Sequence, residues 1–416
     1  MITYYPDRCV CHTQRPTSYP DHIPSSHGTG MTARSLAATR VVGVGLVSCV
    51  LAASCVKNPA SRGRELRVGV VLPLTGDLAA YGSNARDGIE LAAEQLNDTP
   101  GGGSDSVLRI RLFVEDSKGE PASAVSAFRK LVSLDNVTCV IGDVGSSPTL
   151  AMAPIANEAK VVLMSPAASA PAISQAGPFV FRVWPSDVFE AAGVAAYLGR
   201  RGYHRIAVVY VNNDYGQAML GALRLKVQEF GATVIAAEAF DQNSTDMRTQ
   251  LTKARSSHPD VLVLFSYPKD SAIILRQFGE LGLRAPIVAT SSFEDPQVIS
   301  AAPRIAEGVV FTSPMAPSAS DSAVSRFRHS YQDKYKRAPG LVADYGYDAL
   351  RVLAAAAGLS KGMDGEHIRS GLAQIKNFDG ASGLINFDAN GDVIRQAGLK
   401  VVRNGSFVWL TGVESQ

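Results

Sequence analysis

The stretch 66–97 constrains the fold most, because it predicts a buried strand, a loop and an amphipathic helix in immediate succession. Residues 66–72 form a short, β-branched apolar run, which is typical of a strand buried on both faces. Residues 73–77 (PLTGD) interrupt this run, and from about Tyr81 apolar side chains recur at helical spacing. A helix that begins after a parallel strand aims its free N–H groups at the preceding loop, so this unit predicts an anion site.

The same order of elements recurs along the chain. It predicts strands at 108–114, 137–141, 161–164, 205–211, 234–240, 261–265 and 287–289, and helices at 121–134, 148–159, 191–200, 217–230, 246–256 and 271–281. The pattern restarts near Phe181, and residues 213–216 (NDYG) then repeat the Tyr-Gly pair at 81–82. Alternating strands and helices predict two similar α/β lobes with parallel sheets and right-handed crossovers.

The C-terminal part predicts helices at 322–335 and 341–359 and short strands at 383–387, 399–403 and 407–410. Asn390-Gly391 and Asn404-Gly405 are typical hairpin turns. Residues 388–392 resemble the start of a calcium loop but lack its later Glu and flanking helices, so a turn is expected there.

Composition limits the classes of function. At 416 residues, the chain exceeds the roughly 250–300 residues at which a single core stops growing, so two cores are expected. The formal net charge is only +2, and no basic patch or Arg-rich run is present, which argues against nucleic acid as a partner.

The first 65 residues have no domain-like pattern. Residues 1–30 are interpreted as a disordered upstream extension, since their Cys and His spacing fits no zinc site. Residues 31–55 predict a signal peptide, with a basic start and an apolar segment at 41–53 that is too short to span a bilayer comfortably. Residues 56–65 predict a polar tether.

Two cysteines at the end of this segment resemble the lipidated cysteine of a bacterial lipobox. Cys49 follows Leu-Val-Ser and is the better local match, whereas Cys55 is preceded by an apolar segment of more suitable length for a signal peptide. An ordinary signal peptide cleaved near Ala53 or Ser54 is the alternative. Cys139 is then the thiol of the folded region, in an apolar run that predicts a buried side chain.

The chain shows no recognisable catalytic or cofactor motif. There is no Gly-x-Ser-x-Gly elbow, no His-Glu-x-x-His helix, no P-loop and no dinucleotide fingerprint. The histidines of the folded region (His204, His258, His329 and His367) lie among polar neighbours and predict solvated side chains. We therefore expect neither an enzyme nor a cofactor or metal.

Hydroxyl and aromatic side chains concentrate where the predicted strands end. These residues are Thr75, Tyr81, Ser146, Ser147, Ser169, Tyr215, Tyr267 and Ser291. Each serine alone is typical of a turn or helix cap, and each tyrosine of packing. Together they would converge on one crevice at the carboxyl ends of parallel strands, and that crevice would suit a carboxylate with an apolar tail.

Residues 66–416 resemble the substrate-binding lipoproteins of branched-chain amino acid ABC transporters, which are type I periplasmic binding proteins. The motifs that carry the resemblance are 69–76 (GVVLPLTG) followed by Tyr81-Gly82, 140–142 (VIG) with 145–147 (GSS), 165–169 (SPAAS), 181–182 (FR), 213–216 (NDYG) and 275–277 (LRQ). The resemblance implies an α/β fold of two similar Rossmann-like lobes, whose parallel central sheets are joined by a multi-crossing hinge.

The resemblance also implies roles for particular residues. Ser146 and Ser169, with the backbone of Ala167 nearby, match the positions that hold the ligand carboxylate, while Tyr81, Tyr215 and, approximately, Tyr267 match aromatic walls of the cleft. The anion contacts are therefore expected in loops beside the opening stretch.

The family position for an acid that pairs with the ligand ammonium aligns with Ser291 in this chain. A buried ammonium without a carboxylate partner is costly. Either Glu294 or Asp295 reaches back into the cleft, or the ligand lacks a free α-amino group.

The resemblance implies the solute-binding component of an ABC importer, which captures an amino acid or related small carboxylate by hinge closure and presents it to a permease and ATPase. A monomer in the periplasm, lipid-anchored to the membrane, is expected. The alternatives are a sensory or regulatory envelope lipoprotein that binds a protein partner and, third, an enzyme. Lobe 1 is expected at 66–184 plus about 314–390, and lobe 2 at 185–313 plus about 391–416, with crossings near Trp184-Pro185, Ser313-Pro314 and the C-terminal strands.

Overall fold

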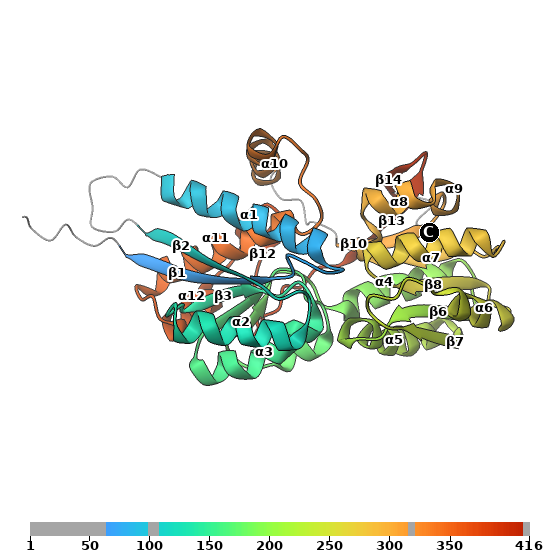
Figure 1. Cartoon of the computed structure of the whole chain (residues 1–416), viewed down its shortest axis with the longest axis horizontal. Coiled ribbons are helices and arrows are strands. Elements are labelled where there is room, and N and C mark those ends of the chain that lie inside the picture. The colour runs from blue at the N-terminus through green and yellow to red at the C-terminus, as the bar shows by residue number, and fades with distance from the viewer. Residues whose placement is uncertain (1–63, 99–107, 315–320, 411–416) are drawn as a thin grey trace, which may run out of the picture. The chain divides into compact units, whose positions relative to one another are not determined.

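The computed structural model describes residues 64–98, 108–314 and 321–410, so the predicted signal peptide, both lipobox cysteines and most of the tether lie outside the described residues. Two large α/β sheets organise the described part, which confirms the predicted fold class (Figure 1). None of the described helices combines the length and apolar character that crossing a membrane requires.

The first sheet is entirely parallel, with strand order β2-β1-β3-β4-β5. Its strands are β1 (Glu65–Leu72), β2 (Arg109–Asp116), β3 (Cys139–Gly142), β4 (Val162–Ser165) and β5 (Val180–Arg182). The helices of this lobe are α1 (Ala79–Asp98), α2 (Pro121–Ser133), α3 (Ser146–Ala159), η1 (Pro171–Gln175), α10 (Asp321–Tyr335), α11 (Ala343–Ser360) and α12 (Gly365–Gln374), and a small hairpin joins β11 (Phe378–Gly380) to β12 (Gly383–Ile385).

Alternation along β1 explains why its apolar run is continuous. Val68 and Val70 pack into the core that contains α1 and α11, whereas Val71 packs into a second core with α2 and α3. Because successive side chains of a strand point to opposite faces, a strand covered by helices on both sides needs apolar residues at every position. Cys139 lies in the core that contains α1 and α11 as a buried free thiol, and burial raises its pKa to about 12.

The second sheet has the order β14-β13-β10-β9-β8-β6-β7. Its strands are β6 (Arg205–Val211), β7 (Thr233–Phe240), β8 (Val261–Phe265), β9 (Ile287–Ala289), β10 (Val310–Pro314), β13 (Ala397–Arg403) and β14 (Ser406–Trp409). Strands β10, β9, β8, β6 and β7 are parallel, β13 pairs antiparallel with β10, and β14 pairs antiparallel with β13. The helices are α4 (Asp187–Arg200), α5 (Asp214–Val227), η2 (Gln228–Phe230), α6 (Arg248–Ser256), α7 (Pro268–Glu280), η3 (Ser291–Phe293), α8 (Pro296–Ala301) and α9 (Pro303–Ala306).

The repeated Tyr-Gly pairs have a common structural reason. A Cβ atom on Gly82 would lie 2.0 Å from the carbonyl oxygen of Pro73, and one on Gly216 would lie 1.9 Å from that of Val211. In both lobes the first turn of the helix therefore contacts the backbone at the end of the preceding strand so closely that only glycine fits. Each pair places its tyrosine on the first turn of its helix.

Several elements differ from the sequence predictions. Helix α12 was not predicted, because glycines weaken its helical pattern, and one of them, Gly371, lies against the backbone of α11. Strand β10 was interpreted as a crossing because its second half, Thr312–Pro314, is polar. Helix α4 begins at Asp187 instead of 191. The Asn390-Gly391 turn is present, but only an isolated bridge between Phe387 and Val393 flanks it.

Candidate ligand-binding site

A cavity of about 40 Å³ lies where loops and helix starts of both sheets meet. Its walls are Tyr81, Val144, Ser146, Ala167, Ser169, Trp184, Glu190, Tyr215, Tyr267, Ser291, Ser292, Leu341 and Val342. The predicted site residues thus come together here, with the exceptions of Thr75, whose hydroxyl donates to Asp116 over 2.6 Å, and Ser147. The backbone N–H of Asp214 donates to the Ser147 hydroxyl over 3.2 Å, which links α5 to α3 beside the cavity.

Ser146 is oriented as a hydrogen-bond donor. It is the first residue of α3, and its Oγ accepts the backbone N–H groups of Ser169 over 3.2 Å and Ala170 over 3.1 Å. A hydroxyl has two lone pairs and one hydrogen, so these two bonds leave the O–H to donate elsewhere. Because Ser146 lines the cavity, this arrangement suits a carboxylate oxygen as the acceptor.

The loop that carries Ala167 is held from behind by Ser165. The Ser165 hydroxyl donates to the carbonyl of Asp143 over 2.6 Å and accepts the N–H groups of Ala167 over 3.3 Å and Ala168 over 2.8 Å. The amide of Ala167 is therefore already engaged inside the protein, and the loop between β4 and η1 has a fixed shape next to Ser146.

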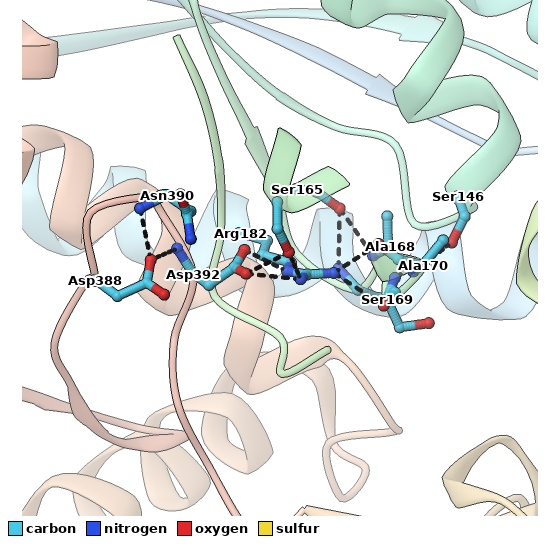
Figure 2. Close-up of polar contacts among 11 residues, drawn as sticks. Ser146, Ser165, Ala168, Ser169, Ala170, Arg182, Asp388, Asn390 and Asp392 are labelled. Atoms are coloured by element: carbon cyan, nitrogen blue, oxygen red, sulfur yellow. Dashed lines mark hydrogen bonds and ion pairs between the residues drawn. The ribbon is translucent and has the colours of Figure 1, made fainter. Parts of the chain in front are cut away.

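Behind this loop lies Arg182, whose side chain is 0% exposed. Its guanidinium forms a two-pronged ion pair with Asp392, with nitrogen–oxygen distances of 2.7 and 2.9 Å, and donates to the carbonyls of Ser169 over 2.9 Å and Ala170 over 3.0 Å. Figure 2 shows these contacts running from Ser146 through Arg182 to Asp392.

Residues 388–392 form the turn at the far end of this chain of contacts. One oxygen of Asp388 accepts the N–H groups of Asn390 over 2.8 Å and Asp392 over 3.0 Å (Figure 2). These acidic residues therefore act as a turn cap and as the partner of Arg182, in agreement with the interpretation of the segment as a turn. Among the described residues, no group of three or more His, Cys, Asp or Glu side chains could hold a metal ion.

Aromatic side chains form the other walls. The rings of Tyr215 and Tyr267 stack with centroids 5.4 Å apart. The Tyr215 hydroxyl lies 2.7 Å from Oγ1 of Thr290, and Asn213 donates to the Tyr267 hydroxyl over 3.2 Å. Burial raises the pKa of both phenols, so both stay neutral and present a ring face to the cavity.

Two further contacts join the lobes beside the cavity, in addition to that of Asp214 with Ser147. The Tyr81 hydroxyl, from the first lobe, donates to the carbonyl of Ser292 in the second over 3.0 Å. Lys269 of α7 forms an ion pair with Asp77, which lies in the loop before α1.

The acid expected to reach into the cavity is neither Glu294 nor Asp295. The Glu294 carboxylate pairs with Lys400 and accepts a hydrogen bond from Ser313 over 2.9 Å. Asp295 caps α8 by accepting the N–H of Gln297 over 2.8 Å. Neither residue lines the cavity, whereas Glu190 of α4 does.

Glu190 and its neighbour Asp187 were not predicted as site residues, because helix α4 was expected to begin at 191. A usable signal was present: Asp187, Glu190, Val194 and Leu198 recur at helical spacing, so two acids fall on the apolar face of α4. Acids on a buried helix face are rare unless they are paired or functional.

Comparison with known proteins agrees with this architecture. A family model described as periplasmic binding protein matches residues 65–405. This chain is a type I periplasmic binding protein. Members of the family bind substrates and are not enzymes.

Individual relatives cover a similar share of this binding protein. The Leu/Ile/Val-binding protein BraC3 of Rhizobium johnstonii is 26% identical over 341 residues, which are 80% of this chain and 90% of BraC3. The leucine-binding protein LivK of Thermotoga maritima is 31% identical, with a TM-score of 0.76 and coverage of 83% of this chain and 98% of LivK. LivJ of Streptococcus pneumoniae, solved with isoleucine, is 26% identical with a TM-score of 0.75, and the alignment covers 83% of this chain and 98% of LivJ.

Proposed function

We propose that this binding protein captures a small carboxylate, an amino acid of the branched-chain or a related type, in the cavity between its lobes and delivers it to the permease and ATPase of an ABC importer. The observation that carries the proposal is the convergence of two hydroxyls, Ser146 and Ser169, with three tyrosines around one cavity. Hydroxyl donors suit a carboxylate, and aromatic faces suit an apolar side chain. The names of the relatives, which bind leucine, isoleucine and valine, point to the same ligands.

Hinge closure is the mechanism that we propose. Crossings near Trp184-Pro185, near Ser313-Pro314 and at the C-terminal strands would let the lobes rotate as units, with lobe 1 at 66–184 plus about 314–390 and lobe 2 at 185–313 plus about 391–416. The contacts of Tyr81 with Ser292 and of Asp77 with Lys269 would then form on closure around the ligand. Ligand binding and closure are coupled because each stabilises the other.

The proposed setting is the periplasm, with the protein a monomer that is lipid-anchored through Cys49 or Cys55. Intact-mass analysis of the membrane-extracted protein tests this directly, because the mature chain should begin with a diacylated cysteine at one of these positions. A water-soluble mature chain that begins at another residue would refute the anchor without affecting the ligand proposal.

A thermal-shift screen of amino acids and small carboxylates tests the capture function. At a ligand concentration one hundred times Kd, stabilisation of about 2.7 kcal/mol is expected. The double variant Ser146→Ala/Ser169→Ala should lose most of the affinity for the ligand. The control is Ser126→Ala, because that hydroxyl lies exposed on α2 and bonds only to its own helix, at Ala122. Absence of stabilisation by every compound would refute capture, and unchanged affinity of the double variant would refute the placement of the ligand.

A further inference from the structure

A separate cavity lies within the second lobe, between α6 and α7, and is called the α6–α7 cavity here. Its volume is about 410 Å³, within the range of about 300–1,000 Å³ that is typical of small-molecule sites. Leu262, near the start of β8, lines the α6–α7 cavity, whereas Tyr267, just past the end of β8, lines the cavity between the lobes. The strand between these two residues spans about 17 Å, so the cavities lie at opposite edges of the sheet.

The floor of the α6–α7 cavity is apolar. It is made by residues of α6, α7, β8 and their connecting segments, namely Leu251, Ala254, Pro259, Leu262, Phe278, Gly282, Leu283 and Ala285. Leu251 and Phe278 are no more than 5% exposed and belong to the core, while Leu283 is half-buried. Because apolar surface gains by leaving water, such a floor suits the body of an organic molecule better than a bare inorganic ion.

The ionisable side chains around this floor are all basic. Arg255, His258 and Arg284 line the cavity, and no Asp or Glu of the described residues does so. All three side chains are exposed, and within the described ranges none of them forms a hydrogen bond or an ion pair. The two arginines carry permanent positive charges, so cations without a partner adjoin the apolar floor.

Acids that are near these residues in the sequence are engaged elsewhere. Asp260 accepts the backbone N–H groups of His204 and Arg205, each over 2.8 Å. Glu280 forms an ion pair with Arg248 over 2.6 Å. Neither carboxylate lines the α6–α7 cavity, so neither acts as the partner of its arginines.

The positions of the arginines have a second possible explanation, since basic residues often stabilise the negative end of a helix dipole. Here other groups already bond to the ends of both helices. Arg205 donates to two carbonyls just past α6 over 2.6 and 3.0 Å, and the backbone N–H groups of 281–283 bond to carbonyls of α7. Arg255 and Arg284 are therefore not needed as helix caps.

We propose that the α6–α7 cavity binds a small organic oxyanion, with its charged group held by Arg255 and Arg284 and its apolar body on the floor. Guanidinium groups suit this role because their planar N–H donors match the oxygens of a carboxylate or phosphate. All of the lining residues belong to one lobe, so occupation does not require hinge closure. The proposal goes beyond ligand capture between the lobes and does not depend on it.

Paired probes that differ only in charge test this site. Calorimetric titration would use 2-naphthoate with 2-naphthamide, and octanoate with octanamide. For the better pair, the wild-type protein should bind the anion at least tenfold more tightly than the amide. The variant Arg255→Gln/Arg284→Gln should weaken binding of the anion at least tenfold and leave that of the amide within twofold. Leu283→Ala should weaken both members at least twofold, because it removes part of the floor.

Two matched variants serve as controls. Arg129→Gln/Arg224→Gln removes the same charge from exposed positions on α2 and α5, so the affinity for the anion should stay within twofold of the wild type. Ser146→Ala/Ser169→Ala changes the cavity between the lobes and should also leave the affinity for the anion within twofold, because the probe binds at the other edge of the sheet.

Two further measurements establish folding and placement. The melting temperature of Arg255→Gln/Arg284→Gln should lie within about 2 °C of the wild type, because substitutions of exposed side chains change stability little. A crystal structure with the anion bound should place its carboxylate within hydrogen-bond distance of Arg255 and Arg284.

The outcomes separate the two proposals. If neither anion binds, if the amides bind as tightly as the anions, or if the arginine variant binds the anion as the wild type does, the α6–α7 site is refuted while capture stands. If Ser146→Ala/Ser169→Ala weakens the anion as much as the arginine variant does, the probe occupies the other cavity, which also refutes the site. The capture function is refuted separately, by a thermal-shift screen in which no compound stabilises the protein.

Discussion

Replacing Arg182 with methionine should lower the free energy of unfolding by about 3 kcal/mol. Removing one partner of a buried ion pair costs about 3–5 kcal/mol, because the other charge is left buried. Here Asp392 would lose two charged hydrogen bonds, but Ser174 would still donate to its Oδ2 over 2.6 Å, and 11% of the Asp392 side chain is exposed. Both features favour the lower end of the range.

Urea unfolding of the ligand-free protein would measure this cost. The slope of the free energy of unfolding against urea concentration should be the same in the variant as in the wild type. Arg129→Met is the matched control, because Arg129 is exposed on α2 and should change stability by no more than about 0.5 kcal/mol. In the double variant Arg182→Met/Asp392→Leu the buried charge is gone, so stability should recover relative to the single variant.

Ligand affinity should fall as well, because Arg182 holds the carbonyls of Ser169 and Ala170 and thereby the loop that faces Ser146. The double variant should recover stability without recovering affinity. The reasoning would be refuted by a single-variant cost below about 1 kcal/mol, or by a double-variant cost equal to the sum of the two single costs.

Three further predictions follow from buried contacts. Gly216→Ala should destabilise the protein strongly in urea unfolding, because the new Cβ would lie 1.9 Å from the carbonyl oxygen at the end of β6. In the control Gly221→Ala, in the same helix, the new Cβ meets nothing within 4 Å, so this variant should be more stable than the wild type by up to about 1 kcal/mol. Burial raises the pKa of Asp143 to about 7, so the native state holds a proton that the unfolded state releases near pH 4. The free energy of unfolding should therefore fall as pH rises from about 4 to 7, and Asp143→Asn should flatten this dependence. An unchanged pH dependence in the variant would contradict the prediction. Tyr81→Phe removes the hydrogen bond to Ser292 between the lobes and should weaken ligand binding by roughly 2- to 12-fold in calorimetry, and equal affinity would show that this bond does not favour closure.

Most of the fold could be predicted because apolar periodicity differs sharply between buried strands and amphipathic helices. β1, β6 and β8 are fully apolar over most of their length, and the expected strand at 205–211 coincides with β6. Helix α12 could not be predicted, since its glycines are used for close packing, an interaction that no local pattern reveals.

The cavity walls were predictable to the extent that they follow strands of a parallel sheet. Ser146 and Ser169 lie in the segments that follow β3 and β4, each four residues after the end of its strand, and such positions meet at one edge. Glu190 was not predictable in this way, because its helix, α4, precedes the first strand of the second sheet and follows the crossing between the sheets. Ser147 follows the same strand as Ser146, but the start of α3 turns it toward α5.

The tyrosines of the two Tyr-Gly pairs both form hydrogen bonds with Ser292. Tyr215 reaches the Ser292 hydroxyl from within the second lobe over 3.4 Å, while Tyr81 reaches the Ser292 carbonyl from the first. Ser292 also lines the cavity. Under the proposed mechanism of hinge closure, the single short turn η3 contributes both to the ligand's surroundings and to the contact between the lobes, so that substitutions which reshape η3 for a new ligand would alter the opening rate as well. Selectivity and residence time in such a protein cannot be tuned independently at this turn.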